Sequence, residues 1–107
     1  MPDFAAAAEQ AIAALVGSLQ PQGIVWFGSA SRGQATADSD LDLLVVVPRS
    51  AGERRDLERR ALVAIWAIRA PIDLLIYYAD EVAAKRGSLG SVVREALETG
   101  RVVHGHV

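Results

Sequence analysis

The most constraining feature of this sequence is the run LDLLVVV at residues 41–47, in which every residue except the second is apolar. A run that is apolar at successive positions predicts a strand covered on both faces. Residues 53–69 follow with apolar side chains at helical spacing, and residues 71–78 (PIDLLIYY) form another apolar run. A strand, a helix and a second strand in this order favour a parallel pair joined by a helical crossover.

The rest of the chain supplies an antiparallel neighbour and further helices. The short apolar run at 24–27 is joined to 41–47 by 13 residues, which allows the two strands to pair antiparallel. Asp3 is a plausible N-cap for a first helix, and Gly100 a stop signal for the last. The remaining predicted elements are helix 4–19, a helix that Asp80 caps and Gly87 closes, helix 91–99 and a final edge strand at 101–105. We therefore expect one α+β domain over residues 1–107, with a small mixed sheet packed with helices.

Three aspartates lie where this topology brings strand ends together. Asp40 and Asp42 alternate along the second strand and so share a face, and Asp73 lies near the start of the parallel third strand. The first strand ends at Gly28-Ser29, and antiparallel pairing brings that turn to the same edge. We expect the three carboxylates and Ser29 to converge there.

Carboxylates gathered on one face repel one another and need a counter-charge. Hard oxygen ligands, in a chain with no cysteine, suit Mg²⁺ or Mn²⁺. A pair of such ions is the usual device for phosphoryl or nucleotidyl transfer. The pattern therefore predicts a metal-dependent transferase site.

Rival interpretations of the motif fit less well. An EF-hand loop needs Gly at its sixth and Glu at its twelfth place, where this chain has Leu43 and Arg49. The stretch GSASRG lacks the Gly-Lys-Ser/Thr of a phosphate-binding P-loop. A purely structural polar turn accounts for Asp38, but it does not account for Asp42 and Asp73, which lie inside apolar runs.

Gly28-Ser29, followed after ten residues by Asp40-x-Asp42, resembles the signature of the DNA polymerase β-like nucleotidyltransferase superfamily. The short chain and the stretch GSASRGQATADSDLDLLV resemble its minimal nucleotidyltransferase (MNT) branch, over essentially the whole sequence. Asp73 matches the third carboxylate of that family, and Arg32 precedes a glycine as its basic residue does. The family fold is an α+β mixed sheet, in agreement with the predicted topology.

The resemblance implies the roles of the site residues. It assigns catalysis and two Mg²⁺ or Mn²⁺ ions to Asp40, Asp42 and Asp73, and the nucleotide phosphates to Gly28, Ser29 and Arg32. It implies ATP as the substrate. Because many MNT proteins are antitoxins of HEPN-domain RNase toxins, it also implies a HEPN toxin as partner and transfer of AMP to a tyrosine of that toxin.

Two function classes stay open at this point. One is an enzyme that nucleotidylates its partner, and the other is a binding module that neutralises a toxin by docking alone. A small-molecule nucleotidyltransferase of the drug-resistance kind is disfavoured, because such enzymes carry a further domain for the acceptor. A net charge of −2 gives no reason to expect direct nucleic-acid binding, and no apolar run is long enough for a membrane span, so we expect a cytoplasmic protein.

Other conspicuous side chains favour structural roles. The arginines at 54–60 are expected on a solvated helix face. His104 and His106 are expected in a loose tail in preference to a metal site. Packing is the expected role of the remaining aromatic side chains, Trp26, Trp66, Tyr77 and Tyr78, although one tyrosine facing the nucleotide is an open alternative.

Overall fold

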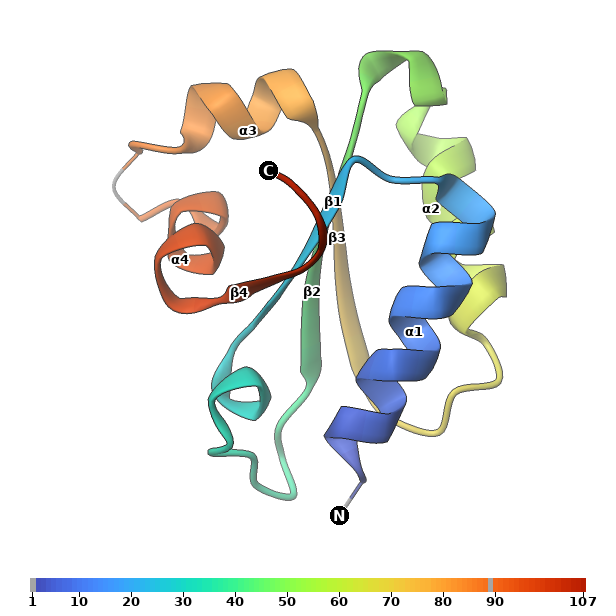
Figure 1. Ribbon diagram of the computed structural model, residues 1–107, viewed down its shortest axis with the longest axis vertical. Coiled ribbons are helices and arrows are strands. Elements are labelled where there is room, and N and C mark those ends of the chain that lie inside the picture. Colours follow the sequence, from blue (N-terminus) through green and yellow to red (C-terminus); the bar gives the residue numbers. More distant parts are fainter. Residues whose placement is uncertain (1, 89) are drawn as a thin grey trace.

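The apolar run at 41–47 forms β2, an inner strand of a four-stranded sheet with the order β3-β2-β1-β4 (Figure 1). The computed structural model describes residues 2–88 and 90–107. Within them the elements are α1 (Phe4–Leu19), β1 (Gly23–Phe27), the 3₁₀ turn η1 (Ser29–Arg32), β2 (Leu41–Val47), the 3₁₀ turn η2 (Arg49–Ala51), α2 (Arg54–Ile65), β3 (Ile72–Tyr78), α3 (Ala79–Lys85), α4 (Val92–Thr99) and β4 (Arg101–Gly105).

The sheet is mixed, as the sequence predicts. Strand β1 pairs antiparallel with β2 and with β4, whereas β2 and β3 run parallel and are joined by α2. The α+β fold class and the strand topology are therefore confirmed. In Figure 1 the turn between β1 and β2 lies at the lower end of the sheet, where β2 and β3 both begin.

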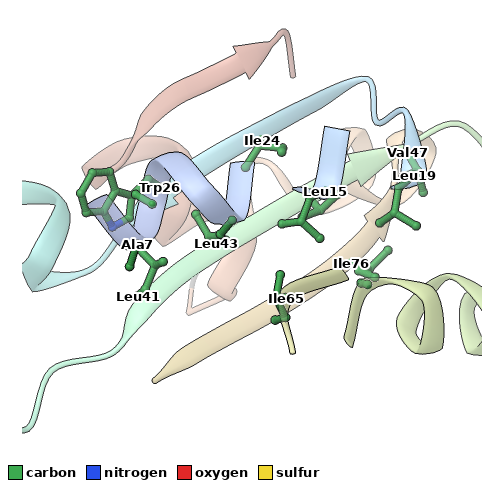
Figure 2. Close-up of a cluster of buried hydrophobic side chains, with 14 of the residues drawn as sticks. Ala7, Leu15, Leu19, Ile24, Trp26, Leu41, Leu43, Val47, Ile65 and Ile76 are labelled. Atoms are coloured by element: carbon green, nitrogen blue, oxygen red, sulfur yellow. The ribbon is translucent and has the colours of Figure 1, made fainter. Parts of the chain in front are cut away.

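Helices cover both faces of the sheet. In Figure 1, α1 and α2 lie on one side and α3 and α4 on the other. Alternate residues of β2 supply the two cores: Leu41, Leu43 and Val45 face α1 and α2, and Leu44 and Val46 face α3 and α4. Figure 2 shows the first core, where α1, β1, β2, α2 and β3 all contribute apolar side chains. A strand with apolar residues on both faces is thus buried on both.

The first helix begins and ends where its sequence signals lie. The side chain of Asp3 accepts a hydrogen bond from the backbone N–H of Ala6, as an N-cap does. At the other end Gln20 adopts the left-handed conformation and donates its backbone N–H to the carbonyl of Val16. Pro21 follows, and β1 begins at Gly23.

The second helix differs from its prediction. It ends at Ile65, so residues 66–69 lie outside it, and the predicted core position of Trp66 is wrong: its exposed fraction is 86%. Beyond Ile65 the chain leaves the α-helical hydrogen-bond pattern, because the backbone N–H groups of Trp66 and Ile68 donate to carbonyls three residues back and not four. Trp26, in contrast, is buried as predicted.

Two smaller predictions are also wrong. Asp80 does not cap the helix after β3; the chain enters α3 at Tyr78, whose backbone N–H donates to Glu81, and Asp80 lies in the first turn. The two histidines are not in a loose tail. His104 pairs with Ile24 in the sheet, and the backbone N–H of His106 donates to the carbonyl of Gln22.

None of the helices in the described ranges is both long and apolar enough to cross a membrane.

Candidate active site

Asp42 and Asp73 lie side by side at the beginnings of β2 and β3. Each is the second residue of its strand, and the parallel register makes their Cα atoms partners. Asp42 has the same parity along β2 as Leu44 and Val46, so its side chain is on the face that α3 and α4 cover. The predicted juxtaposition of these two carboxylates is therefore present in the sheet.

The carboxyl group of Asp42 is electrostatically disfavoured as an anion. Burial, followed by the carboxylates of Asp73, Asp40 and Glu95, raises its pKa from 3.8 to about 6. The charged groups that shift its pKa are three carboxylates. A cation bound beside Asp42 would therefore relieve both the burial cost and the repulsion.

Gly28 makes room for this carboxylate. A Cβ atom at residue 28 would lie 2.0 Å from Oδ2 of Asp42, closer than any real contact. Gly28 also has a φ of 83°, in the region that favours glycine. Both facts require glycine at the end of β1, where the chain turns away beside Asp42.

Ser29 opens the turn that follows. Its Oγ is 2.9 Å from Oγ of Ser39, and Ser39 Oγ accepts a hydrogen bond from the backbone N–H of Thr36 at 2.9 Å. Ser31 Oγ donates to the carbonyl of Gly28 at 2.7 Å. These bonds brace the loop that joins β1 to β2. We define the acid edge as Gly28, Asp40, Asp42 and Asp73.

The remaining predicted site residues are exposed. Asp40 lies immediately before β2 and is close enough to act on the charge of Asp42. Arg32 ends the turn η1, and Gly33 follows it in the left-handed conformation. The turn thus presents the exposed side chain of Arg32 at the same end of the sheet.

The donor set suits a hard divalent cation, although the side chains are not drawn together around one position. Among residues 2–88 and 90–107, no three His, Cys, Asp or Glu side chains come close enough to hold a metal ion. The strand register and the charge on Asp42 nevertheless supply what such an ion needs: carboxylates on neighbouring strands whose repulsion raises the pKa of Asp42. The chemistry of the residues therefore fits Mg²⁺ or Mn²⁺.

Comparison with known proteins agrees with this arrangement. The family described as the nucleotidyltransferase domain matches residues 9–103. The chain belongs to this family. No curated protein matches the sequence significantly. One crystal structure similar to this nucleotidyltransferase domain is described as a toxin-antitoxin with AMP-PNP; it has a TM-score of 0.52 and 23% identity, over 92% of this chain and 73% of that chain. The likeness establishes a shared fold.

Two residues beside the nucleotidyltransferase domain's acid edge escape sequence reasoning. Glu95 lies on α4, and only the packing of α4 against β1 brings it near Asp42. Ser39 holds Ser29 through a contact between residues ten apart in one loop. In the sequence Ser39 is marked only by its position between Asp38 and Asp40, which does not indicate a contact with Ser29.

Proposed function

We propose that this nucleotidyltransferase domain is a minimal nucleotidyltransferase of the MNT kind, formed by residues 1–107, that transfers AMP from ATP to a hydroxyl of a toxin protein. The observation that carries the proposal is the register that sets Asp42 beside Asp73 at the edge where Gly28 and Ser29 end β1. The coarser part, a nucleotidyltransferase domain, rests on the family match.

The proposed residue roles follow from their positions. Asp40 and Asp42 would hold a divalent ion that carries the triphosphate, and Asp73 would share a second ion with them. Two Mg²⁺ or Mn²⁺ ions supply, when bound, charge neutralisation and a lower pKa for the acceptor hydroxyl. Ser29 and the backbone N–H groups of its turn would hold the outer phosphates.

The transfer itself is an in-line displacement. The acceptor oxygen bonds to the α-phosphorus, the bond from that phosphorus to pyrophosphate breaks, and the hydroxyl proton passes to water. Arg32, exposed beside Ser29, would offset phosphate charge as the pyrophosphate leaves. Gly28 has no side chain, so the triphosphate can approach the backbone closely.

The acceptor is proposed as a tyrosine of a HEPN-domain toxin in the same cell compartment, the cytoplasm. Two independent features support a macromolecular acceptor. The similar toxin-antitoxin structure contains an ATP analogue. The acid edge also lies at the surface, with Asp40 and Asp73 both exposed, so a side chain on another protein can reach it.

The test is transfer to the protein encoded beside this one. The two proteins are incubated with ATP and Mg²⁺, and the intact mass of the partner is measured. We expect the partner to gain AMP units. Asp73→Asn should abolish the gain, and Ser29→Ala should slow it by one to two orders of magnitude if about 1.5–3 kcal/mol of hydrogen bonding to phosphate is lost.

A matched control lies in the same loop. Asp38 is exposed and two residues before Asp40, and Asp38→Asn should leave the transfer rate unchanged. If the partner's mass stays constant while its toxicity is still suppressed, the enzyme is excluded and the protein acts by docking. Calorimetry with ATP should show binding that depends on Mg²⁺ or Mn²⁺; equal affinity in chelator would exclude the metal-bound nucleotide.

A further inference from the structure

Helix α4 carries a polar hollow on its surface, which we call the α4 hollow. The helix lies on the side of the sheet that the side chain of Asp42 faces (Figure 1). The volume of the hollow is about 320 Å³, which is within the range of small-molecule sites. A second hollow, of about 340 Å³, lies between α1 and the segment before β3, on the opposite side of the sheet. The residues that line the α4 hollow are Gly90, Ser91, Arg94, Glu95, Glu98 and Thr99.

The C-terminal end of α4 is fixed against the end of β1. A Cβ atom on Gly100, which follows the helix, would lie 2.8 Å from the Cβ atom of Phe27 and 2.8 Å from the carbonyl oxygen of Trp26. Phe27 is the register partner of Asp42, and β4 begins at Arg101 opposite Trp26. The close approach at Gly100 therefore holds the last turn of α4 at the end of the sheet where the acid edge lies.

Glu95 belongs both to the α4 hollow and to the surroundings of Asp42. The hydroxyl of Thr99 donates to the backbone carbonyl of Glu95 at 2.8 Å, and the spacing of four residues puts the two side chains on one side of the helix. Both residues line the α4 hollow, and both are exposed. The carboxylate of Glu95 is also one of the three that raise the pKa of Asp42. The α4 hollow and the acid edge are therefore neighbouring parts of one surface.

The lining of the α4 hollow favours the uncharged part of a nucleotide. Its carboxylates repel phosphate groups. Glu98 accepts a hydrogen bond at 2.8 Å from Nε of Arg94, so the charge of Glu98 is offset within the helix. The ionised carboxylate of Glu95 can only accept hydrogen bonds, and the hydroxyl groups of a ribose can donate them. Carboxylates bind ribose hydroxyls in this way in dinucleotide-binding domains.

We propose that the α4 hollow is the nucleoside subsite of this domain, where the carboxylate of Glu95 accepts hydrogen bonds from the 2′ and 3′ hydroxyls of a ribonucleoside triphosphate. This subsite rests on the proposed function, which puts the triphosphate on the acid edge. Because only the 5′ methylene group and an oxygen separate the ribose ring from the α-phosphorus, one bound nucleotide can reach both Glu95 and Asp42. The subsite makes the domain selective for ribonucleotides over dideoxyribonucleotides.

The test compares three ligands by calorimetry in the presence of Mg²⁺: ATP, 2′,3′-dideoxy-ATP and inorganic tripolyphosphate. The wild type should bind ATP about tenfold more tightly than dideoxy-ATP, because a hydrogen bond to a charged acceptor is lost with the hydroxyls. Glu95→Ala should abolish this preference and still bind tripolyphosphate. The melting temperature of the variant checks that it is folded, as expected for a substitution at an exposed position.

Two further variants isolate the α4 hollow. Glu9→Ala is the matched control, because it makes the same substitution at an exposed position of another helix, α1, and it should keep the wild-type preference for ATP. Thr99→Trp places a large side chain in the α4 hollow. It should weaken the binding of ATP and leave the binding of tripolyphosphate unchanged.

Three results would overturn the proposal, and they differ in what they mean for the proposed function. Equal affinities of the wild type for ATP and dideoxy-ATP would show that the protein does not bind the ribose hydroxyls. If Glu95→Ala weakens the binding of all three ligands by the same factor, Glu95 acts through its charge alone. In both cases tripolyphosphate still binds to the wild type with Mg²⁺, and the proposed function stands. If none of the three ligands binds to the wild type, the proposed function fails together with the subsite.

Discussion

The two ends of the β2–β3 strand pair treat their carboxylates in opposite ways. Where the strands begin, Asp42 lies beside Asp73, and neighbouring carboxylates raise its pKa. Where they end, Asp80 and Glu81 each have an arginine. We call this second region the paired end, defined by Arg49, Arg54, Tyr78, Asp80 and Glu81.

The arginines at the paired end are held in place by several contacts each. Arg49 donates from Nε and from a terminal nitrogen to the two oxygens of Asp80, both at 2.9 Å. Arg54 donates to Glu81 and to the carbonyl of Ile76. Both guanidinium groups also lie over the ring of Tyr78, whose hydroxyl donates to the carbonyl of Gly52 at 2.6 Å.

The pKa shifts differ in sign accordingly. The hydrogen bond from Arg49 lowers the pKa of Asp80, and that from Arg54 lowers the pKa of Glu81. Burial and three carboxylates raise the pKa of Asp42. At the paired end the arginines neutralise the carboxylates and stabilise the fold. At the acid edge the negative charge is left for a bound cation to neutralise.

The largest expected effect comes from closing the acid edge with one methyl group. Gly28→Ala places a Cβ on Asp42 Oδ2 and forces a side chain into a φ of 83°. We expect the free energy of unfolding to fall by about 2–4 kcal/mol and transfer to be lost, because strain and displacement of the carboxylate add. Thermal unfolding and partner mass measure the two effects.

Gly33→Ala separates strain from the clash. Gly33 has a φ of 72°, but an added Cβ there would meet nothing within 4 Å. The control should therefore lose about 1 kcal/mol from backbone strain alone and keep transfer. Equal losses of stability in the two variants would mean that the contact between Gly28 and Asp42 has no special cost.

Much of this comparison could be predicted from the sequence. The apolar runs predict the strands, the helix between them predicts the parallel pair, and Asp42 and Asp73 are predicted at the same edge of the sheet, whereas the register that makes them partners comes from the structure. These predictions succeed because alternation along strands and the crossover rule act locally. The gathering of the carboxylates at one edge follows from them.

What could not be predicted depends on packing between distant segments. Nothing in the sequence indicates that Asp42 rests against Gly28, or that Glu95 on α4 approaches it. The exposure of Trp66 was missed because the stripe of Ile65 and Ile68 suggested a longer helix, and a helix ending at Ile65 leaves the next side chain outside the core. The arginines of α2 likewise divide: Arg54 is half-buried at the paired end, whereas Arg55 is exposed.

A substitution of Arg54 disrupts the paired end. Arg54→Ala removes the hydrogen bonds to Glu81 and Ile76 and the contact with Tyr78, so we expect a loss of about 1 kcal/mol after allowance for solvent screening, or roughly 5 °C in Tm. Transfer should persist, because the acid edge is at the other end of the strands. Arg49→Ala should lower Tm less, since both members of its ion pair are more exposed.

The pH dependence of the Tm difference tests how much of it comes from the ion pair between Arg54 and Glu81. Because its pKa is lowered in the folded protein, Glu81 contributes stability above the pKa of the unfolded chain, about 4.5, and this contribution is lost as the pH falls through the folded value. The difference in Tm between the wild type and Arg54→Ala should therefore shrink below pH 4.5. A difference that stays constant into strong acid would show that the hydrogen bond to Ile76 and the contact with Tyr78 account for it.

The last effect has the opposite sign and belongs to the acid edge. Without metal, Asp42→Asn removes a carboxylate whose pKa rises from 3.8 to about 6 on folding. Between these values the folded state holds more protons than the unfolded state, so the wild type loses stability as the pH rises from about 4 to 6 and stays at the lower level above that. That rise in pKa corresponds to at most about 3 kcal/mol, and solvent screening of the half-buried group reduces it to about 1 kcal/mol.

Asp42→Asn should therefore be about 1 kcal/mol more stable than the wild type at pH 8, and the gain should shrink as the pH falls and disappear below 3.8, where the wild-type carboxyl is protonated in both states. Thermal melts across this range in chelator measure it, with Asp38→Asn as a control that follows the wild-type profile. The same substitution should abolish transfer. A variant that gains stability and loses activity marks a carboxylate kept for binding, whereas a loss of stability at pH 8 would show that Asp42 supports the fold like the acids of the paired end.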